Sequence, residues 1–152
     1  MSGAYIQRLR MIRDEYSAAR YALSYVTTNW HQAEVIRQLG VTPRKDFDDA
    51  ARNLEITYFI RLFAEFEGIL KDHLTTNHPL VTVSDNPKVD WLISRVMRVE
   101  SLTIDPALRR QIDLVRSYRN SIAHRSNAAA VVTFNNALAR LNRFLDKLPD
   151  PR

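Results

Sequence analysis

The spacing of the apolar residues constrains the fold most strongly, because they recur every three to four positions over most of the chain. This period matches the 3.6 residues per turn of an α-helix. Helix breakers are rare: the 152 residues include three glycines and six prolines, and the prolines lie outside the apolar runs. No segment shows the alternation that is typical of a strand. The pattern predicts an all-α protein, a bundle of about five helices.

The first predicted helix runs from about Ala4 to Leu39 and ends at Gly40, with Pro43 beyond it. Its β-branched run at positions 26–28 favours a bend. The apolar positions are spaced like the seam of a helical bundle. They are Leu9, Ile12, Tyr16, Ala19, Leu23, Val26, Trp30 and Ala33.

The second predicted helix begins with Asp46 as its cap and runs to about Leu74. Its apolar arc is wide and rich in phenylalanine, which predicts that it is the central helix of the bundle. The residues closest to the middle of this arc are Phe59, Leu62, Phe63, Phe66, Ile69 and Leu70.

The three remaining predicted helices are marked mainly by their starts. Asn86 followed by Pro87 predicts a cap and first turn of a helix to about Val99. Asp105 followed by Pro106 predicts the same start for the fourth helix, and Ser126 or Asn127 opens the last one. We expect one domain over residues 1–148 and a short proline-containing tail at 149–152.

Composition narrows the class of protein. Hydrophobic residues at 45% and charged residues at 26% are typical of a globular chain rather than a disordered one. The absence of cysteine excludes disulfides, thiolate zinc sites and cysteine nucleophiles. Neither a signal peptide nor an apolar run long enough for a membrane span is recognisable, so a cytoplasmic protein without membrane contact is expected.

The net positive charge slightly favours binding to polyanions. Lys and Arg number 22 against 17 Asp and Glu, a net charge of +5, and arginine predominates. Several arginines could form a basic face for RNA, although a solvated helix face is the more common outcome. They are Arg8, Arg10, Arg13, Arg20, Arg95 and Arg98.

The fourth predicted helix carries a cation inside its apolar stripe. On a helical wheel, Arg119 lies about 40° from Val115, and a buried cation needs a partner. Glu67, on the second helix, also points toward the interior, and Glu55 is a competing partner. A carboxylate would hold the guanidinium in one rotamer and leave donors for a phosphate. The alternative is a structural ion pair in a purely structural bundle.

His124 follows Arg119 in the same segment, but about 140° around an ideal helix. The two side chains converge only if the helix bends or ends near Ala123, or if two chains form the site together. Asn120 lies one turn before His124, where it can orient the imidazole or a substrate. An imidazole can exchange protons at neutral pH, which suits metal-free RNA cleavage by the ribose 2′-OH. The alternative is a histidine that caps a helix end.

No cofactor or metal site is expected. His73 lies on the apolar stripe of the second helix as a core residue, and His31 and His78 lack ligand spacing to a second histidine or carboxylate motif. No phosphate-binding glycine loop, zinc-protease motif or serine-hydrolase motif occurs.

The segment 119–124, Arg-Asn-Ser-Ile-Ala-His, resembles the R-x4-6-H signature of the HEPN superfamily. Residues 63–71 resemble the acidic second helix of these all-helical domains. The resemblance implies a symmetric homodimer in which the two motifs face each other. It also implies a metal-independent endoribonuclease, a prokaryotic toxin or antiphage effector, whose partners include RNA, a cognate antitoxin and a nucleotidyltransferase-like protein.

The resemblance also implies roles for individual residues. Arg119 and His124 are the expected catalytic pair, Asn120 is the polar helper, and Glu67 is the acidic residue, with Glu65 in reserve. Some members carry, two residues after the histidine, a tyrosine that a nucleotidyltransferase modifies. Ser126 stands there in this chain, which puts that regulation in doubt. Other members have lost nuclease activity, so the alternative function is a non-catalytic module that binds a partner protein or nucleotide.

Overall fold

The computed structural model describes residues 3–32, 38, 44–124 and 129–149. These residues contain helices and no strand, which confirms the all-α prediction. The helices are α1 (Gly3–Thr28), α3 (Arg44–Asn77), α4 (Val89–Val99), α5 (Pro106–Ala123) and α6 (Phe134–Leu145). None of these helices combines the length and the apolar character that crossing a membrane requires.

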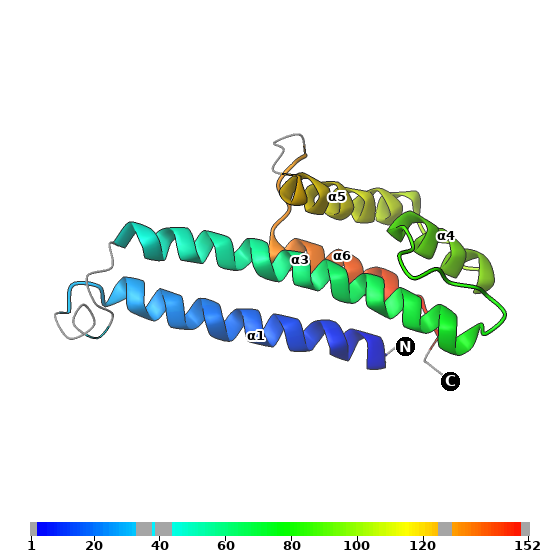
Figure 1. Cartoon of the computed structure of the whole chain (residues 1–152), viewed down its shortest axis with the longest axis horizontal. Helices are drawn as coiled ribbons and strands as arrows, with labels where there is room; N and C mark the ends of the chain where they lie inside the picture. The colour runs from blue at the N-terminus through cyan, green and yellow to red at the C-terminus, as the bar shows by residue number, and fades with distance from the viewer. Residues whose placement is uncertain (1–2, 33–37, 39–43, 125–128, 150–152) are drawn as a thin grey trace.

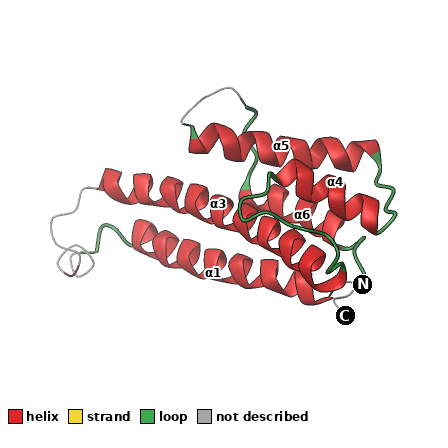
Figure 2. Ribbon diagram, turned by 45° about the vertical axis from the view of Figure 1, so that its right-hand side comes forward, coloured by secondary structure: helices red, strands yellow, loops and turns green. Residues whose placement is uncertain are grey.

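The two long helices α1 and α3 lie side by side and antiparallel, and the three shorter helices gather against the C-terminal half of α3 (Figure 1). The first half of α3 and the end of α1 therefore extend beyond the rest of the bundle, as Figure 2 also shows. Residues 78–88 run back along α3, so that α4 begins beside the middle of α3 and ends near its C-terminus.

Helix α3 is the central helix, as its apolar arc predicts. Phe59, Phe63 and Phe66 are all buried, as are the leucines on the same face. The ring of Phe66 has its centroid 6.1 Å from that of Phe63 and 5.7 Å from that of Phe144 on α6. Aromatic pairs at such distances add to the free energy of burial. The core therefore forms where α3 meets α1, α4, α5 and α6.

One of the predicted helix starts is confirmed and three need correction. The side chain of Asp105 accepts a hydrogen bond of 2.8 Å from the backbone N–H of Ala107, as predicted for the cap of α5. Asn86 is not a cap, because α4 begins at Val89 with Lys88 before it. Asp46 lies in the first turn of α3, which begins at Arg44.

The last helix begins at Phe134, later than predicted, because a cap and a tertiary contact both act there. Thr133 accepts a hydrogen bond of 3.3 Å from the backbone N–H of Asn136. Glu55 on α3 accepts one of 3.2 Å from the backbone N–H of Phe134. Free N–H groups of the first turn are thus satisfied. Ser126 and Asn127 lie outside the described residues.

Helix α1 ends at Thr28, well before the predicted Leu39, and side chains bind two of the carbonyl groups near its end. Thr27 donates a hydrogen bond of 2.8 Å to the backbone oxygen of Leu23, and the side chain of Asn29 donates one of 2.8 Å to that of Tyr25. Such local bonds offer the backbone an alternative to continuing the helix. Ala33, Leu39, Gly40 and Pro43 lie outside the described residues.

Candidate functional site

One pocket brings together three of the four predicted site residues. It has a volume of about 260 Å³ and is bounded by α3, by the start of α4 and by α5. Helix α3 contributes Phe63 and Glu67, residues 87–90 form a second wall, and α5 contributes Arg116, Arg119 and Asn120. The back-folded segment 78–88 creates this pocket, because it brings the start of α4 beside the middle of α3.

Arg119 lies over an aromatic ring rather than against a carboxylate. Its Cζ is 6.0 Å from the ring centroid of Phe63, within reach of a cation–π interaction. Its Nη1 donates a hydrogen bond of 3.3 Å to Oδ1 of Asn120. Within the described residues no ion pair joins Arg119 to Glu67, so the expected structural ion pair is not formed. The guanidinium keeps donors available for a ligand.

Glu67 is half-buried in the same pocket. Burial raises the pKa of its carboxyl group above the usual range, and the positive charge of Arg119 opposes that shift in part. The two side chains therefore interact through space without direct contact. A carboxyl group with a raised pKa beside a cation is a feature of functional sites more often than of solvated surfaces.

Replacing Glu67 with Gln is expected to raise the melting temperature at neutral pH. The pKa of Glu67 is raised in the folded state. Between the ordinary glutamate pKa and this raised pKa, the folded protein therefore binds more protons than the unfolded protein. The stability of the wild-type protein falls as the pH rises through this range. The variant avoids this loss. Its advantage should disappear below pH 4, where the carboxyl group is protonated in both states.

Thermal unfolding followed by circular dichroism across pH 3–7.5 measures this effect. Asp85→Asn is the control, because Asp85 is exposed in the loop before α4 and should give no pH-dependent difference. A Glu67→Gln advantage that persists unchanged at pH 3 would show that charge burial is not its cause.

The other arginine of the pocket is neutralised. Arg116 forms an ion pair with Asp90, and its Nη2 lies 4.0 Å from a carboxylate oxygen of Asp113. Arg109 reaches the same two carboxylates at 3.6 Å and 3.5 Å. This network fixes the start of α4 to α5 and leaves Arg119 as the arginine of the pocket without a carboxylate partner in the part of the chain that is described.

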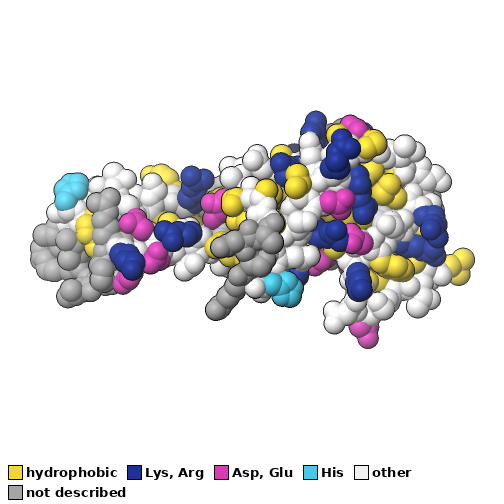
Figure 3. Space-filling view, turned by 90° about the horizontal axis from the view of Figure 1, so that it is seen from above, with side chains coloured by type: hydrophobic (Ala, Val, Ile, Leu, Met, Phe, Trp, Pro, Cys, Tyr) yellow, Lys and Arg dark blue, Asp and Glu magenta, His cyan; other side chains and the backbone are white. Residues whose placement is uncertain are grey.

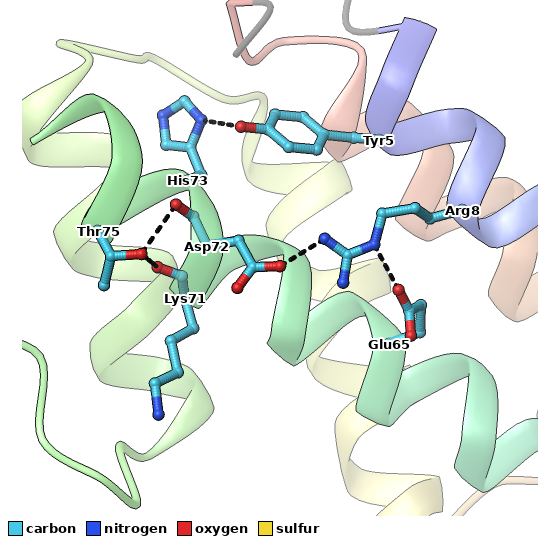
Figure 4. A network of polar contacts seen from close by, with 7 residues as sticks. All are labelled: Tyr5, Arg8, Glu65, Lys71, Asp72, His73 and Thr75. Carbon is cyan, nitrogen blue, oxygen red and sulfur yellow. Dashed lines mark hydrogen bonds and ion pairs between the residues drawn. The ribbon is translucent and has the colours of Figure 1, made fainter. Parts of the chain in front are cut away.

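The two alternative acidic residues lie elsewhere. Glu55 accepts the hydrogen bond that starts α6, so it does not compete for Arg119. Glu65 faces α1, where its Oε1 lies 2.5 Å from Nε of Arg8, and Asp72 binds the same guanidinium at 2.5 Å (Figure 4). Neither residue lines the pocket, so of the three acidic candidates only Glu67 lies there with Arg119.

His124 is the predicted site residue that the pocket does not include. Helix α5 continues without a break to Ala123, and His124 follows as its C-cap, with its backbone N–H donating to the oxygen of Asn120 at 3.0 Å. The side chain is exposed. This confirms the helical-wheel prediction that the side chains of Arg119 and His124 do not converge within one straight helix.

Larger pockets lie away from these residues. One of about 570 Å³ lies between the start of α5 and the end of α6, and its charged lining residues are Asp105, Arg143, Asp146 and Lys147. This pocket is lined by both acidic and basic side chains, and it contains no residue of the segment 119–124. Chemistry rather than size therefore identifies the pocket of Arg119 as the candidate site.

The predicted basic face is partly neutralised. Arg8 is paired with Glu65 and Asp72, and Arg13 is paired with Asp14 at 2.7 Å. On the face seen in Figure 3, lysines and arginines gather over the thicker end of the molecule with acidic side chains among them. This surface is mixed in charge and is not a continuous basic patch.

A cluster that sequence reasoning missed joins two histidines and a glutamate. His73 is buried and hydrogen-bonded, as predicted for a core residue. The spacing of His78 suggested that it has no histidine or carboxylate partner, but it does have one. Oε1 of Glu100 lies 2.7 Å from Nε2 of His73 and 2.5 Å from Nε2 of His78. Glu100 is 22 residues from His78 in the chain, so only the return of α4 to the end of α3 brings them together.

The ionisation of this cluster follows from its burial. Burial lowers the pKa of His73, and its hydrogen bond to the carboxylate of Glu100 opposes the shift without cancelling it. Burial acts to raise the pKa of Glu100, but the hydrogen bonds from His78 and His73 outweigh it and hold that pKa below its usual range. The resting state is a carboxylate beside a neutral imidazole.

Comparison with known proteins gives no relative. No protein-family profile matches the chain, and no curated protein and no solved structure shows significant similarity to it.

Proposed function

We propose that this protein is a metal-independent endoribonuclease of the HEPN type, a prokaryotic toxin or antiphage effector that acts in the cytoplasm as a homodimer. The observation that carries the proposal is the pocket of Arg119. The arginine of the R-x4-6-H signature lies there beside Asn120 and Glu67, and no described carboxylate pairs with it. A guanidinium with free donors is suited to a phosphodiester.

The proposed reaction uses the 2′-hydroxyl of the RNA. The imidazole of His124 takes the 2′-OH proton while the 2′-oxygen attacks the adjacent phosphorus. The bond between phosphorus and the 5′-oxygen breaks, which leaves a 2′,3′-cyclic phosphate and a 5′-OH after that oxygen takes a proton. Arg119 stabilises the charge that develops on the phosphoryl oxygens. Asn120 orients the substrate, and Glu67 restrains Arg119 electrostatically.

Because His124 lies outside the pocket of its own chain, the reaction requires a second copy. The exposed face of α5 carries Arg110, Leu114, Ser117, Asn120 and His124 at helical spacing. Leu114 in the middle of this face is 44% exposed. Two such faces packed about a twofold axis would put the end of one α5 near the pocket of the other. Each active site would combine Arg119 of one chain with His124 of its partner.

Mixing two inactive variants tests the shared site. Arg119→Ala and His124→Ala are each expected to be inactive as homodimers. In a heterodimer of the two, one site has lost both residues and the other site is intact. After complete subunit exchange, half of the dimers are mixed and each has one of two sites, so about a quarter of wild-type activity is expected.

Exchange itself is checked by native mass spectrometry of variants that differ in mass. Mixed dimers without activity would contradict a site that pairs Arg119 of one chain with His124 of the other. Monomers at micromolar concentration would contradict the dimer.

A second candidate function is a binding module for a phosphate-containing ligand or partner. The pocket of a single chain offers Arg119 and Asn120 but no imidazole, which favours binding without chemistry. This candidate predicts that RNA oligonucleotides are retained and released intact, and that Arg119→Ala abolishes binding while His124→Ala has no effect. If the protein is a nuclease, both variants are expected to lose cleavage.

A further inference from the structure

Two histidines and a glutamate bring their side chains to one point at the end of the bundle opposite the protruding helices. Their potential ligand atoms, one from each of His73, His78 and Glu100, all lie within 4.8 Å of one another. His73 is completely buried, whereas the side chains of His78 and Glu100 are 26% and 15% exposed. The cluster is thus closed on the protein side and open to solvent through His78.

Each ligand is held by a different structural feature. His73 lies on α3, His78 follows the end of α3 with its N–H donating to the oxygen of Leu74 at 3.0 Å, and Glu100 is the C-cap of α4. Beyond Glu100 the backbone N–H of Leu102 donates to Met97 at 2.8 Å, with Ser101 at a φ of 52°. This is the Schellman pattern, which fixes the direction in which the helix ends.

The far side of the His73 ring is also restrained. Nδ1 of His73 lies 3.0 Å from the hydroxyl oxygen of Tyr5 on α1 (Figure 4) and 3.2 Å from the side-chain nitrogen of Asn77. Without metal, Nδ1 accepts hydrogen bonds and Nε2 donates to Glu100. Metal binding would move the ring proton to Nδ1, which can donate it to the hydroxyl oxygen of Tyr5, and so free the lone pair of Nε2 for the ion. Metal-binding histidines almost always have such a partner on the second ring nitrogen.

We propose that His73, His78 and Glu100 bind one divalent metal ion of the zinc class, which ties the end of α3 to the end of α4. Two imidazoles and one carboxylate suit Zn²⁺, whereas Mg²⁺ and Ca²⁺ prefer oxygen ligands alone. The solvent-facing side leaves room for a water molecule as the fourth ligand. The ion replaces the shared hydrogen bonds at Oε1 of Glu100.

Only a small rearrangement is needed to admit the ion. With bonds of about 2.0–2.2 Å in a tetrahedron, ligand atoms lie roughly 3.3–3.5 Å apart. The Nε2 atoms now lie 2.7 Å and 2.5 Å from Oε1 of Glu100. These two separations must increase by less than about 1 Å, and the two Nε2 atoms, which lie within 4.8 Å of each other, must come to the same spacing. The partly exposed side chains of His78 and Glu100 can rotate to allow this.

The metal site is separate from the proposed nuclease site. His73 follows Glu67 by six positions on α3, about 9 Å along the helix axis and on another face. The inference therefore stands or falls independently of the proposed function.

Zinc binding to protein stripped with EDTA and then dialysed tests this inference. Isothermal titration calorimetry with Zn²⁺ alone is expected to give one site per chain, and Zn²⁺ is expected to raise the melting temperature. His78→Gln and Glu100→Gln should each weaken binding at least about tenfold, since each removes a ligand. Both residues are partly exposed, so these variants are expected to fold. Mg²⁺ should give no stabilisation.

His31→Gln is the matched control, because His31 is an exposed histidine outside the cluster and should leave the affinity unchanged. Absence of zinc binding by the wild-type protein would overturn the inference. So would a zinc affinity that both His78→Gln and Glu100→Gln leave unchanged, which would assign the binding to other surface groups. Circular dichroism of each variant confirms that the helices are intact.

Discussion

Arg119→Ala is expected to reduce RNA cleavage by about 10²–10³-fold, the effect typical of removing one group that stabilises transition-state charge. Arg119 lies over Phe63 in the pocket and is paired with no described carboxylate, so its removal costs phosphate contacts without breaking an ion pair. The melting temperature should therefore change little. Cleavage of a mixed RNA pool, measured as initial rates on a gel, checks the loss.

His124→Ala is expected to give a loss of at least the same size, because it removes the group that takes the 2′-OH proton. Each variant has a matched control. Arg143→Ala removes an exposed arginine on α6, outside both the site and the proposed dimer face, and His31→Ala removes an exposed histidine outside the site. Full cleavage by His124→Ala, or equal losses in the controls, would contradict the assigned roles.

The largest effect on stability is expected from Phe66→Ala, at about 3–5 kcal/mol of the free energy of unfolding. Phe66 is completely buried, and its ring contacts those of Phe63 on α3 and Phe144 on α6. Truncation leaves a cavity at the centre of the core, where the packed helices restrict relaxation. A loss of this size is a large part of the stability of an ordinary single domain.

Urea unfolding followed by circular dichroism measures this loss, with Met11→Ala as the control. Met11 is 58% exposed on α1, so its truncation should cost less than about 0.5 kcal/mol. A Phe66→Ala loss below about 1 kcal/mol would contradict the position of α3 at the centre of the bundle.

Local signals in the sequence predicted most of the fold. The apolar arc of α3 identified the central helix, and Asp105 with Pro106 located the start of α5, because both signals act within one helix. The start of α6 could not be predicted in the same way, since Glu55, from a distant part of the chain, satisfies the N–H of Phe134. The end of α1 was not predicted either, and side chains bind two of the carbonyl groups near it.

Local sequence patterns also predicted part of the candidate site. Helical spacing predicted that Arg119 and Glu67 face the interior and that His124 does not converge with Arg119. The choice between Glu67, Glu65 and Glu55 required the tertiary structure, because Arg8 and Phe134 occupy the other two. The cluster of His73, His78 and Glu100 has no sequence signature, since the fold-back of α4 creates it.

The most direct test of the proposed nuclease is the chemistry of its products in the absence of metal. Wild-type protein and His124→Ala are incubated with a mixed RNA pool in excess EDTA, with circular dichroism recorded under the same conditions because EDTA would also strip the proposed zinc site. Folded wild-type protein is expected to cleave the RNA and leave 2′,3′-cyclic phosphate and 5′-OH ends, and the variant is expected to give no cleavage. Products with 3′-OH and 5′-phosphate ends, cleavage that requires added Mg²⁺, or equal cleavage by both proteins would contradict it.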